Sequence, residues 1–261
     1  MPATSEETPA RLTDAQVGEV LALARDADSV ELKLTVPDSH RRQAATALGV
    51  DPLDAQIRQV YFFDTPDLAL NEVGVVVRAR RVQGRGDDTV VKLRPVTPAA
   101  VEAERSSDNL VVEVDAMPGG FVCSASMKGA LGPKAVKDVA AGRKGIRSLY
   151  SKEQRRFYEA HAPEGLGLDD LSILGPITVL KLKLRPPDLS MRLVAEVWFY
   201  PDGSRIVELS AKSPPSEAFQ AAAELRAFLA GKGLDVSGEQ QTKTKTALEF
   251  FAAELSEGSG S

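Results

Sequence analysis

The stretch "SVELKLTV", residues 29–36, alternates apolar side chains with charged or polar ones at a period of two. This period is typical of a β-strand, because successive side chains of a strand point to opposite faces. Leu32 and Leu34 share one face, and Glu31 and Lys33 share the other. The charged face meets either solvent or a polar interior, and the other strands of the chain bear on that choice.

Strands of the same kind are expected through much of the chain. Turn signals such as "DTPD" and "PDG" separate them. We expect strands within residues 55–64, 74–82, 88–96, 109–115, 177–186, 191–200 and 204–213, and helices within 12–27, 39–50, 216–233 and 238–255. Residues 118–170 are expected to be mainly helical and looped. Two runs of strands, each followed by helices, predict an α+β fold with an antiparallel sheet or barrel.

Composition limits the classes of function. The 261 residues, 43% of them hydrophobic, are enough to bury a sizeable core. A net charge of -5 argues against general nucleic-acid binding, so no nucleic-acid partner is expected. The single cysteine, Cys123, rules out an internal disulfide. The sequence shows no secretory leader and no apolar run approaching the ~20 residues of a membrane span, so we expect a cytoplasmic protein without a membrane partner.

The charged faces of the strands are segregated by sign. Three strands are almost purely basic on that face and one is purely acidic; the residues are Arg78 and Arg80, Lys92 and Arg94, Lys181, Lys183 and Arg185, and the acidic Glu113 and Asp115. Like charges opposite each other across strands are unfavourable, so the pattern suggests an absent counter-charge. A sheet with its charged face in water is the alternative. If the sheet instead closes into a barrel with its apolar face outward, the charges line the interior and a bound polyanion offsets their burial.

The two signs of charge suggest the ligand. Lysine and arginine clusters bind phosphate oxygens through charge-assisted hydrogen bonds. Glutamate and aspartate clusters bind hard divalent cations such as Mg²⁺ or Mn²⁺, which also coordinate polyphosphate oxygens. A metal-bound triphosphate or polyphosphate therefore fits such an interior, with Glu31 on the metal side and Lys33 on the phosphate side.

Several of these stretches resemble a known family. They are "YFFDTPDLALNEVGVVVRAR" (61–80), "TVVKLRP" (89–95), "VVEVD" (111–115), "LKLK" (180–183), "VAEVWFYPDG" (194–203), "IVELSAK" (206–212), "SKEQRRFY" (151–158) and "QTKTKTALEF" (241–250). The chain resembles CYTH-domain proteins, the superfamily of triphosphate tunnel metalloenzymes, which contains class IV adenylyl cyclases, thiamine triphosphatases and inorganic triphosphatases. The resemblance implies a closed, antiparallel, eight-stranded β-barrel with helices packed outside.

The resemblance also implies a division of the chain. Residues 1–27 would be an N-terminal helical extension and residues 28–252 the tunnel domain, with a helical insertion at about 118–170. Residues 253–261 would be a flexible tail.

The resemblance implies site residues as well. Phosphate ligands are expected at Lys33, Arg78, Arg80, Lys92, Arg94, Arg155, Lys181, Lys183, Lys212 and Lys243. Metal ligands for Mg²⁺ or Mn²⁺ are expected at Glu31, Glu113, Asp115, Glu196 and Glu208. Of these residues, Glu31 and Lys33 are expected to act in catalysis.

Two departures from the family pattern fall on the metal side. The first strand lacks one glutamate of the family's Glu-x-Glu-x-Lys, because Ser29 stands there, and Ser210 replaces a glutamate of the last strand. The expected function is a metal-dependent phosphohydrolase of a triphosphate or polyphosphate. The alternatives are a catalytically weak module that binds polyphosphate or a nucleotide, and a class IV type adenylyl cyclase.

Two further signals leave alternatives open. The basic segment at residues 134–158 could touch nucleic acid, with Tyr150, Phe157 and Tyr158 for stacking, or could be a solvated helical face. Trp198 faces the interior by alternation, where it either stacks an organic part of a substrate or packs in the wall.

Overall fold

The computed structural model describes residues 14–234 and 243–258. Its strands are β1 (Ser29–Val36), β2 (Gln56–Asp64), β3 (Val75–Val82), β4 (Asp88–Leu93), β5 (Leu110–Met117), β6 (Gly120–Ala130), β7 (Ser172–Leu184), β8 (Leu193–Phe199) and β9 (Arg205–Ser213). Its α-helices are α1 (Asp14–Arg25), α2 (Arg41–Ala47), α3 (Ala69–Glu72), α4 (Ala135–Ala140), α5 (Lys152–His161), α6 (Ala218–Gly231) and α7 (Lys243–Gly258). Short 3₁₀ turns are η1 (Asp38–His40), η2 (Pro52–Asp54), η3 (Pro98–Glu104), η4 (Ile146–Leu149), η5 (Leu168–Asp170) and η6 (Pro215–Glu217).

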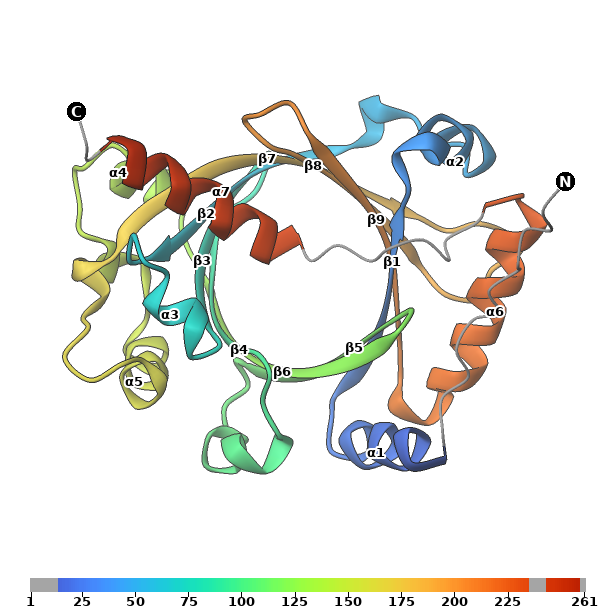
Figure 1. The fold of residues 1–261 in the computed structure, drawn as a ribbon, viewed down its shortest axis with the longest axis horizontal. Helices are drawn as coiled ribbons and strands as arrows, with labels where there is room; N and C mark the ends of the chain where they lie inside the picture. The colour runs from blue at the N-terminus through green and yellow to red at the C-terminus, as the bar shows by residue number, and fades with distance from the viewer. Residues whose placement is uncertain (1–13, 235–242, 259–261) are drawn as a thin grey trace, which may run out of the picture.

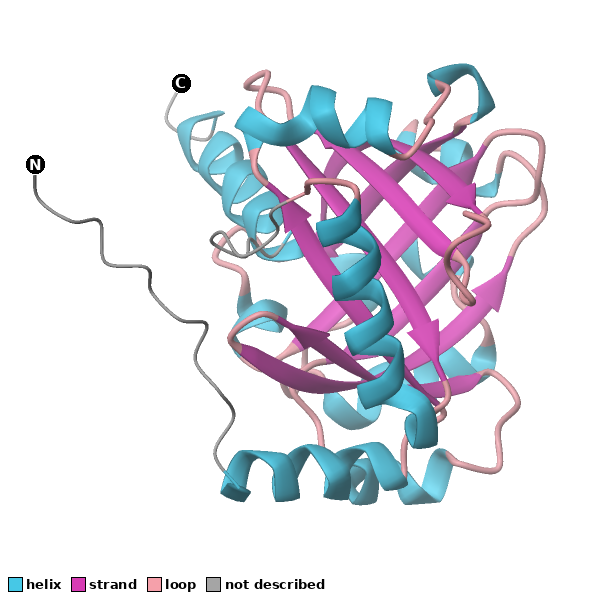
Figure 2. Ribbon diagram, turned by 90° about the vertical axis from the view of Figure 1, so that its right-hand side faces the viewer, coloured by secondary structure: helices cyan, strands magenta, loops and turns pink. Residues whose placement is uncertain are grey.

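The strands close into a barrel in the order β1-β5-β6-β4-β3-β2-β7-β8-β9, and the helices surround it (Figures 1 and 2). The closed barrel confirms the expected fold class, but the expected eight strands and wholly antiparallel pairing are wrong. The described residues form nine strands, and β1 pairs with β5 in parallel. An odd number of strands in a closed ring cannot alternate in direction throughout, so at least one neighbouring pair has to be parallel.

The ninth strand is β6, which lies between β5 and β4. Residues 120–130 were expected in a helical and looped insertion, and that expectation is wrong. The strand was hidden because small residues such as Ser124, Ala125 and Ser126 occupy its centre, all of them buried. They give little contrast between an apolar and a polar face.

The barrel turns its apolar face outward. On β3 the side chains of Val75, Val77 and Ala79 are each 1% exposed and belong to the main apolar core. The same core contains Leu209 of β9 and Leu225 of α6, a helix that packs beside β9. Burial of this face under helices leaves the charged face for the interior, as the sequence pattern predicts.

A second, smaller apolar cluster fills one part of the interior. It joins residues of β2, β7, β8 and β9 to α7, and its members are Val60, Phe62, Leu174, Ile177, Val179, Trp198, Tyr200, Ile206, Ala247, Leu248 and Phe251. Helix α7 lies across one mouth of the barrel in the view of Figure 1. The packing of this helix places its first residue, Lys243, at the cavity described below.

The two ends of the chain differ from expectation in one respect. The leading helix is confirmed as α1, whereas residues 1–13 lie outside the described residues. Residues 253–258, expected in a flexible tail, continue α7, and residues 259–261 lie outside the described part. Within the described residues no helix is both long enough and apolar enough to span a membrane.

The outward apolar face can be tested at two adjacent residues of β9. Leu209 is 1% exposed in the outer core, whereas Ser210 points into the barrel interior. Leu209→Ala should lower the free energy of unfolding by about 2–5 kcal/mol, because it removes buried methyl groups and leaves a cavity. Ser210→Ala should change it by less than about 0.5 kcal/mol. Urea denaturation measures both, and a larger loss for Ser210→Ala would reverse the assigned faces.

Candidate functional site

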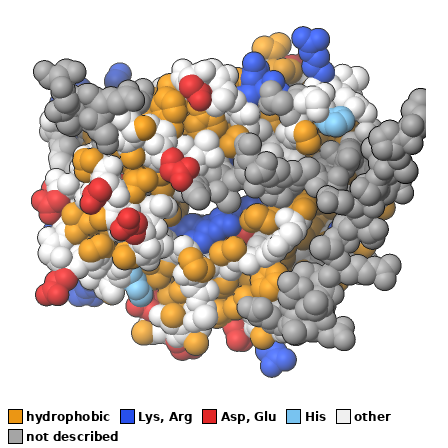
Figure 3. All heavy atoms as spheres, viewed as in Figure 1, with side chains coloured by type: hydrophobic (Ala, Val, Ile, Leu, Met, Phe, Trp, Pro, Cys, Tyr) orange, Lys and Arg blue, Asp and Glu red, His pale blue; other side chains and the backbone are white. Residues whose placement is uncertain are grey.

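The interior of the barrel holds a cavity of about 330 Å³. Lysine and arginine side chains are visible within the hollow in Figure 3. The lining comes from all nine strands and α7 and includes Glu31, Lys33, Thr35, Arg58, Arg78, Arg80, Lys92, Arg94, Glu113, Ser126, Lys128, Lys181, Glu196, Trp198, Glu208, Ser210, Lys212 and Lys243. The charged strand faces therefore meet in an enclosed space, and the alternative of a sheet face in open solvent is wrong.

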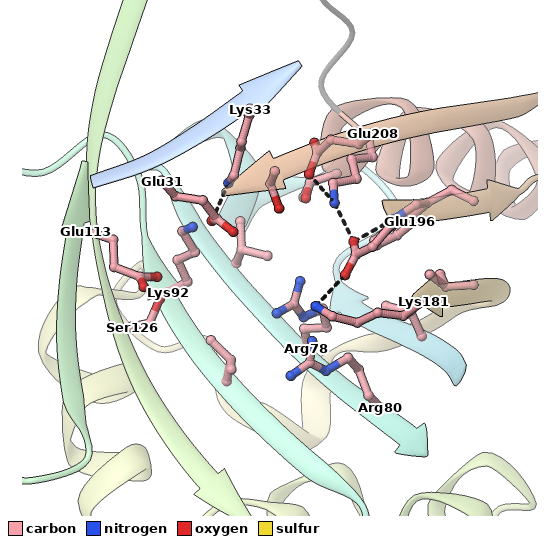
Figure 4. A pocket seen from close by; sticks show the side chains of 18 of the residues that line it. Glu31, Lys33, Arg78, Arg80, Lys92, Glu113, Ser126, Lys181, Glu196 and Glu208 are labelled. Atoms are coloured by element: carbon pink, nitrogen blue, oxygen red, sulfur yellow. Dashed lines mark hydrogen bonds and ion pairs between the residues drawn. The ribbon is translucent and has the colours of Figure 1, made fainter. Parts of the chain in front are cut away.

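Three adjacent strands form a basic wall, which we define as Arg78 and Arg80 of β3, Lys92 of β4 and Lys128 of β6. Val90 pairs with Arg78 on one side and with Lys128 on the other, so the two cations flank it. Figure 4 shows Arg78, Arg80 and Lys92 reaching into the same space from neighbouring strands. The strand register therefore concentrates positive charge on one side of the cavity.

The basic wall is short of counter-charge. Arg80 pairs with Asp88 at 2.7 Å, and Lys92 lies 3.7 Å from Asp115. Within the described part of the chain, neither Arg78 nor Lys128 has a carboxylate within 4.0 Å. Burial lowers the pKa of Arg78 to about 10, with Arg80 adding to the effect. Burial likewise lowers the pKa of Lys92 to about 8. The lowered pKa values of Arg78 and Lys92 mean that nearby carboxylates do not fully offset the cost of burying these two cations. An anion in the cavity would therefore stabilise their charged forms.

The opposite side of the cavity carries a pair of glutamates bridged by a lysine. Glu196 of β8 is directly opposite Glu208 of β9. Lys243 Nζ lies 2.5 Å from Glu196 Oε2 and 2.7 Å from Glu208 Oε1. Lys181 Nζ lies 2.8 Å from Glu196 Oε1 (Figure 4). Burial alone would raise the pKa of Glu196, but Lys243 and Lys181 outweigh it and hold that pKa well below its ordinary value. The Trp198 indole N–H also donates to Glu196 Oε2, at 3.1 Å.

A third charge cluster lies on the inward face of β5, covered by side chains that line the cavity. Asp115 is fully buried, with Oδ1 2.8 Å from Lys33 Nζ and Oδ2 3.0 Å from Arg94 Nη1. Burial opposes ionisation of Asp115, but Lys33, Lys92 and Arg94 together lower its pKa. Asp115 is therefore a buried anchor for cations that face the cavity.

The remaining predicted carboxylates are also paired. Glu31 Oε2 lies 3.2 Å from Lys33 Nζ, and Glu113 pairs with Lys212 and accepts a hydrogen bond from Ser29. The expectation that the charges lack salt-bridge partners is therefore wrong for the acidic residues. It failed because most of the pairs form between strands or with α7, and the pattern of one strand does not show which side chains of other elements it meets.

The donor set can be tested against a divalent metal. Among the described residues no group of three or more Asp, Glu, His or Cys side chains is placed to hold a metal. Mg²⁺ does not need one, because it is commonly held by one or two carboxylates together with substrate phosphates and water. Glu196 and Glu208 present oxygens to a single cationic atom of Lys243, so this pair fits such a metal.

Most of the predicted site residues line the cavity, and three do not. Lys183 is exposed close to the end of β7, where the strand has passed the cavity. Arg155 lies on α5, outside the barrel, and Asp115 is covered by cations that line the cavity. The expectation of phosphate ligands at Lys183 and Arg155 therefore has no support in the structure, and a metal at Asp115 would have to displace buried cations.

Sequence reasoning missed two cations of the cavity. Arg58 shares its strand face with the apolar Val60 and Phe62, so the pattern of β2 did not single it out. Lys128 was missed together with β6. Trp198 does line the cavity, at 3% exposure.

The aromatic residues of the basic segment are not available to stack bases. Tyr150, Phe157 and Tyr158 are 1–2% exposed and belong to the outer core. The solvated-face interpretation is therefore the one that the structure supports for residues 134–158.

Comparisons with known proteins agree with this architecture. No family model matches the chain, and no curated protein matches it. One similar solved structure is a Hippeastrum protein described provisionally as an adenylyl cyclase with a dominant triphosphatase activity; it has 20% identity and a TM-score of 0.59, over 81% of this chain and 91% of the other. Another is a Bacillus halodurans protein described provisionally as an adenylate cyclase, with 13% identity and a TM-score of 0.59, over 84% of this chain and 97% of the other. The chain therefore shares the fold of these two structures over most of its length.

Proposed function

We propose that this chain is a metal-dependent phosphohydrolase that cleaves a triphosphate or polyphosphate bound in the barrel. The observation that carries the proposal is the basic wall, whose cations share a cavity of about 330 Å³ without a full set of carboxylate partners. Buried cations of this kind are stabilised by a multiply charged anion. The triphosphatase activity named for the Hippeastrum structure, which shares the fold, supports a triphosphate rather than a monophosphate.

Binding would use the wall as a set of fixed donors. Arg78 of β3 supplies a guanidinium that can hold two phosphate oxygens at once. Lys92 and Lys128 supply ammonium groups from β4 and β6, the next two strands of the barrel. Asp115 keeps Lys33 and Arg94 in place from behind. Lys33 and Arg94 are thus oriented before the anion arrives, which reduces the reorganisation needed when charge develops on the transferred phosphate.

Hydrolysis would use the acidic side. A divalent metal held by Glu196 and Glu208 would, when bound, neutralise phosphate charge and polarise a water molecule. Burial acts to lower the pKa of Lys33, but Glu31, Asp115 and Glu208 together raise it above its ordinary value, so this residue stays a cation facing the phosphate. Glu31, on the same strand face, can accept a proton from the attacking water.

A binding module without efficient turnover is the second candidate. It is favoured by the pairing of all five predicted acidic residues with lysine or arginine side chains. It is also favoured by Ser29 and Ser210, because a hydroxyl is a weaker ligand for Mg²⁺ than a carboxylate.

Product analysis separates these functions. The protein is incubated with tripolyphosphate, thiamine triphosphate or ATP in the presence of Mg²⁺ or Mn²⁺, and phosphate and cyclic nucleotide are both measured. Phosphate release without cyclic nucleotide supports hydrolysis, and cyclic AMP from ATP supports a cyclase instead. Tight tripolyphosphate binding without any product would favour the binding module.

Arg78 tests the anion site directly. Arg78→Ala should weaken tripolyphosphate binding about tenfold or more, because losing a charged hydrogen bond costs about 1.5–3 kcal/mol. Arg226→Ala is a matched control, because Arg226 is an exposed residue of α6 outside the barrel. Calorimetry compares the two variants, and equal losses would indicate a general surface attraction rather than a site in the tunnel.

Lys92 predicts a pH dependence. With its pKa near 8, Lys92 loses its charge as pH rises through about 8, and a bound anion favours the charged form. The affinity for tripolyphosphate should therefore fall from about pH 7 to pH 9 more steeply in the parent than in Lys92→Arg, since arginine stays protonated. Protonation of tripolyphosphate itself affects both proteins equally, so it cancels in the ratio of their affinities. A parent-to-variant ratio that stays constant with pH would exclude Lys92 from the site.

Asp115 tests the buried anchor. Asp115→Asn should lower the free energy of unfolding by about 3–5 kcal/mol, because it leaves buried cations unpaired. Asp88→Asn removes the partner of Arg80 in a more exposed pair and should cost about 1 kcal/mol or less. Thermal denaturation with and without tripolyphosphate should show the larger rescue in Asp115→Asn. Similar melting temperatures for both variants would contradict the anchoring role.

A further inference from the structure

The opposed glutamates on β8 and β9 pose a charge problem that one lysine resolves. Carboxylates directly opposite each other across two strands repel, and Glu196 and Glu208 occupy such a pair of positions. Lys181 does not relieve this repulsion alone, because it forms its ion pair with Glu196. The ammonium of Lys243 contacts both carboxylates, at 2.5 and 2.7 Å, and is the cation that joins them.

This cation comes from outside the strands, on helix α7. The Tyr200 hydroxyl donates to the Lys243 backbone oxygen at 3.0 Å, which fastens the first residue of the helix to the end of β8. The Lys243 ammonium also lies 5.0 Å from the centre of the Trp198 ring, within the range of a cation–π contact. The ammonium is therefore held by two carboxylates, an aromatic face and a backbone anchor.

We propose that Lys243 is a tethered counter-ion that occupies the cation position of the Glu196–Glu208 pair, and that a bound polyphosphate releases this position to a divalent metal by drawing the ammonium onto itself. The inference rests on the proposed function, because it takes the tunnel ligand to be a polyphosphate. Lys243 would therefore exchange partners: its ammonium contacts the two carboxylates before the anion binds and contacts the anion afterwards.

Electrostatics sets the direction of this exchange. A divalent cation arriving alone has to displace an ammonium that the chain holds in place, so metal binding to the free protein is weakened. A polyphosphate in the cavity gives Lys243 another anionic partner, and the carboxylates then lose their resident cation. Each ligand therefore favours the other, and such coupling acts equally in both directions.

Metal binding without turnover provides the test. The affinity for Mn²⁺ is measured from the electron paramagnetic resonance signal of the free ion, with and without tripolyphosphate. In Lys243→Gln, Mn²⁺ should bind about tenfold tighter without tripolyphosphate, a size typical of coupling between two ligands. The gain in Mn²⁺ affinity caused by tripolyphosphate should shrink in the same variant.

Two controls accompany this variant. Lys232→Gln removes an amine that pairs with Asp188 at 3.6 Å after the end of α6, and it should leave Mn²⁺ binding unchanged. Lys243→Arg keeps the charge and should retain the weak binding of Mn²⁺ in the absence of tripolyphosphate. Circular dichroism checks that each variant is folded.

If Lys243→Gln does not fold, Tyr200→Phe replaces it, because that change removes the backbone anchor of Lys243 but keeps the ammonium. Tyr200→Phe should then bind Mn²⁺ more tightly than the parent. Unchanged or weaker Mn²⁺ binding in the folded variant overturns the inference. Titration of the parent with tripolyphosphate tests the proposed function separately, because a parent that does not bind tripolyphosphate contradicts that function. If the parent binds tripolyphosphate but Lys243→Gln has the same Mn²⁺ affinity as the parent, only the exchange is contradicted.

Discussion

Charge confined inside a closed barrel is the constraint on which the rest of this structure depends. The apolar strand faces pack outward under helices, so the charged faces have nowhere to lie but the interior. Isolated buried charges are strongly unfavourable, and the protein meets this with three different arrangements. Asp115 anchors cations from beneath the cavity lining, Lys243 joins two glutamates, and the basic wall keeps an incomplete set of carboxylate partners.

These arrangements fix several of the charged side chains around the cavity. The anchoring carboxylate fixes the positions of Lys33 and Arg94 without occupying the space that a ligand would use. Helix α7 is part of the same design, since its apolar residues pack on the interior cluster and its first residue supplies an interior cation. One cation of the cavity thus comes from a helix far along the chain from the strands that supply most of the lining.

The alternation of side chains was enough to predict the strand faces. Arg78, Lys92 and Glu196 line the cavity because a period of two is a property of the strand itself. The pairing of charges was not predictable in this way, because it depends on which residues of different strands are neighbours. Strand β6 was not predicted because its central residues are small, and its residue Lys128 was therefore not predicted to line the cavity. Lys183 has the right period, yet it lies beyond the cavity, since alternation gives the face of a residue but not its height in the barrel.

The most direct test of the account is a crystal structure of the protein grown with tripolyphosphate in the absence of divalent metal. The account predicts phosphate density inside the barrel, with oxygens within about 3 Å of Arg78, Lys92 and Lys128. Two results would contradict the claim that the interior charge holds a polyanion. One is tripolyphosphate bound only to the outer surface, and the other is the absence of phosphate density beside Arg78, Lys92 and Lys128 at saturating ligand.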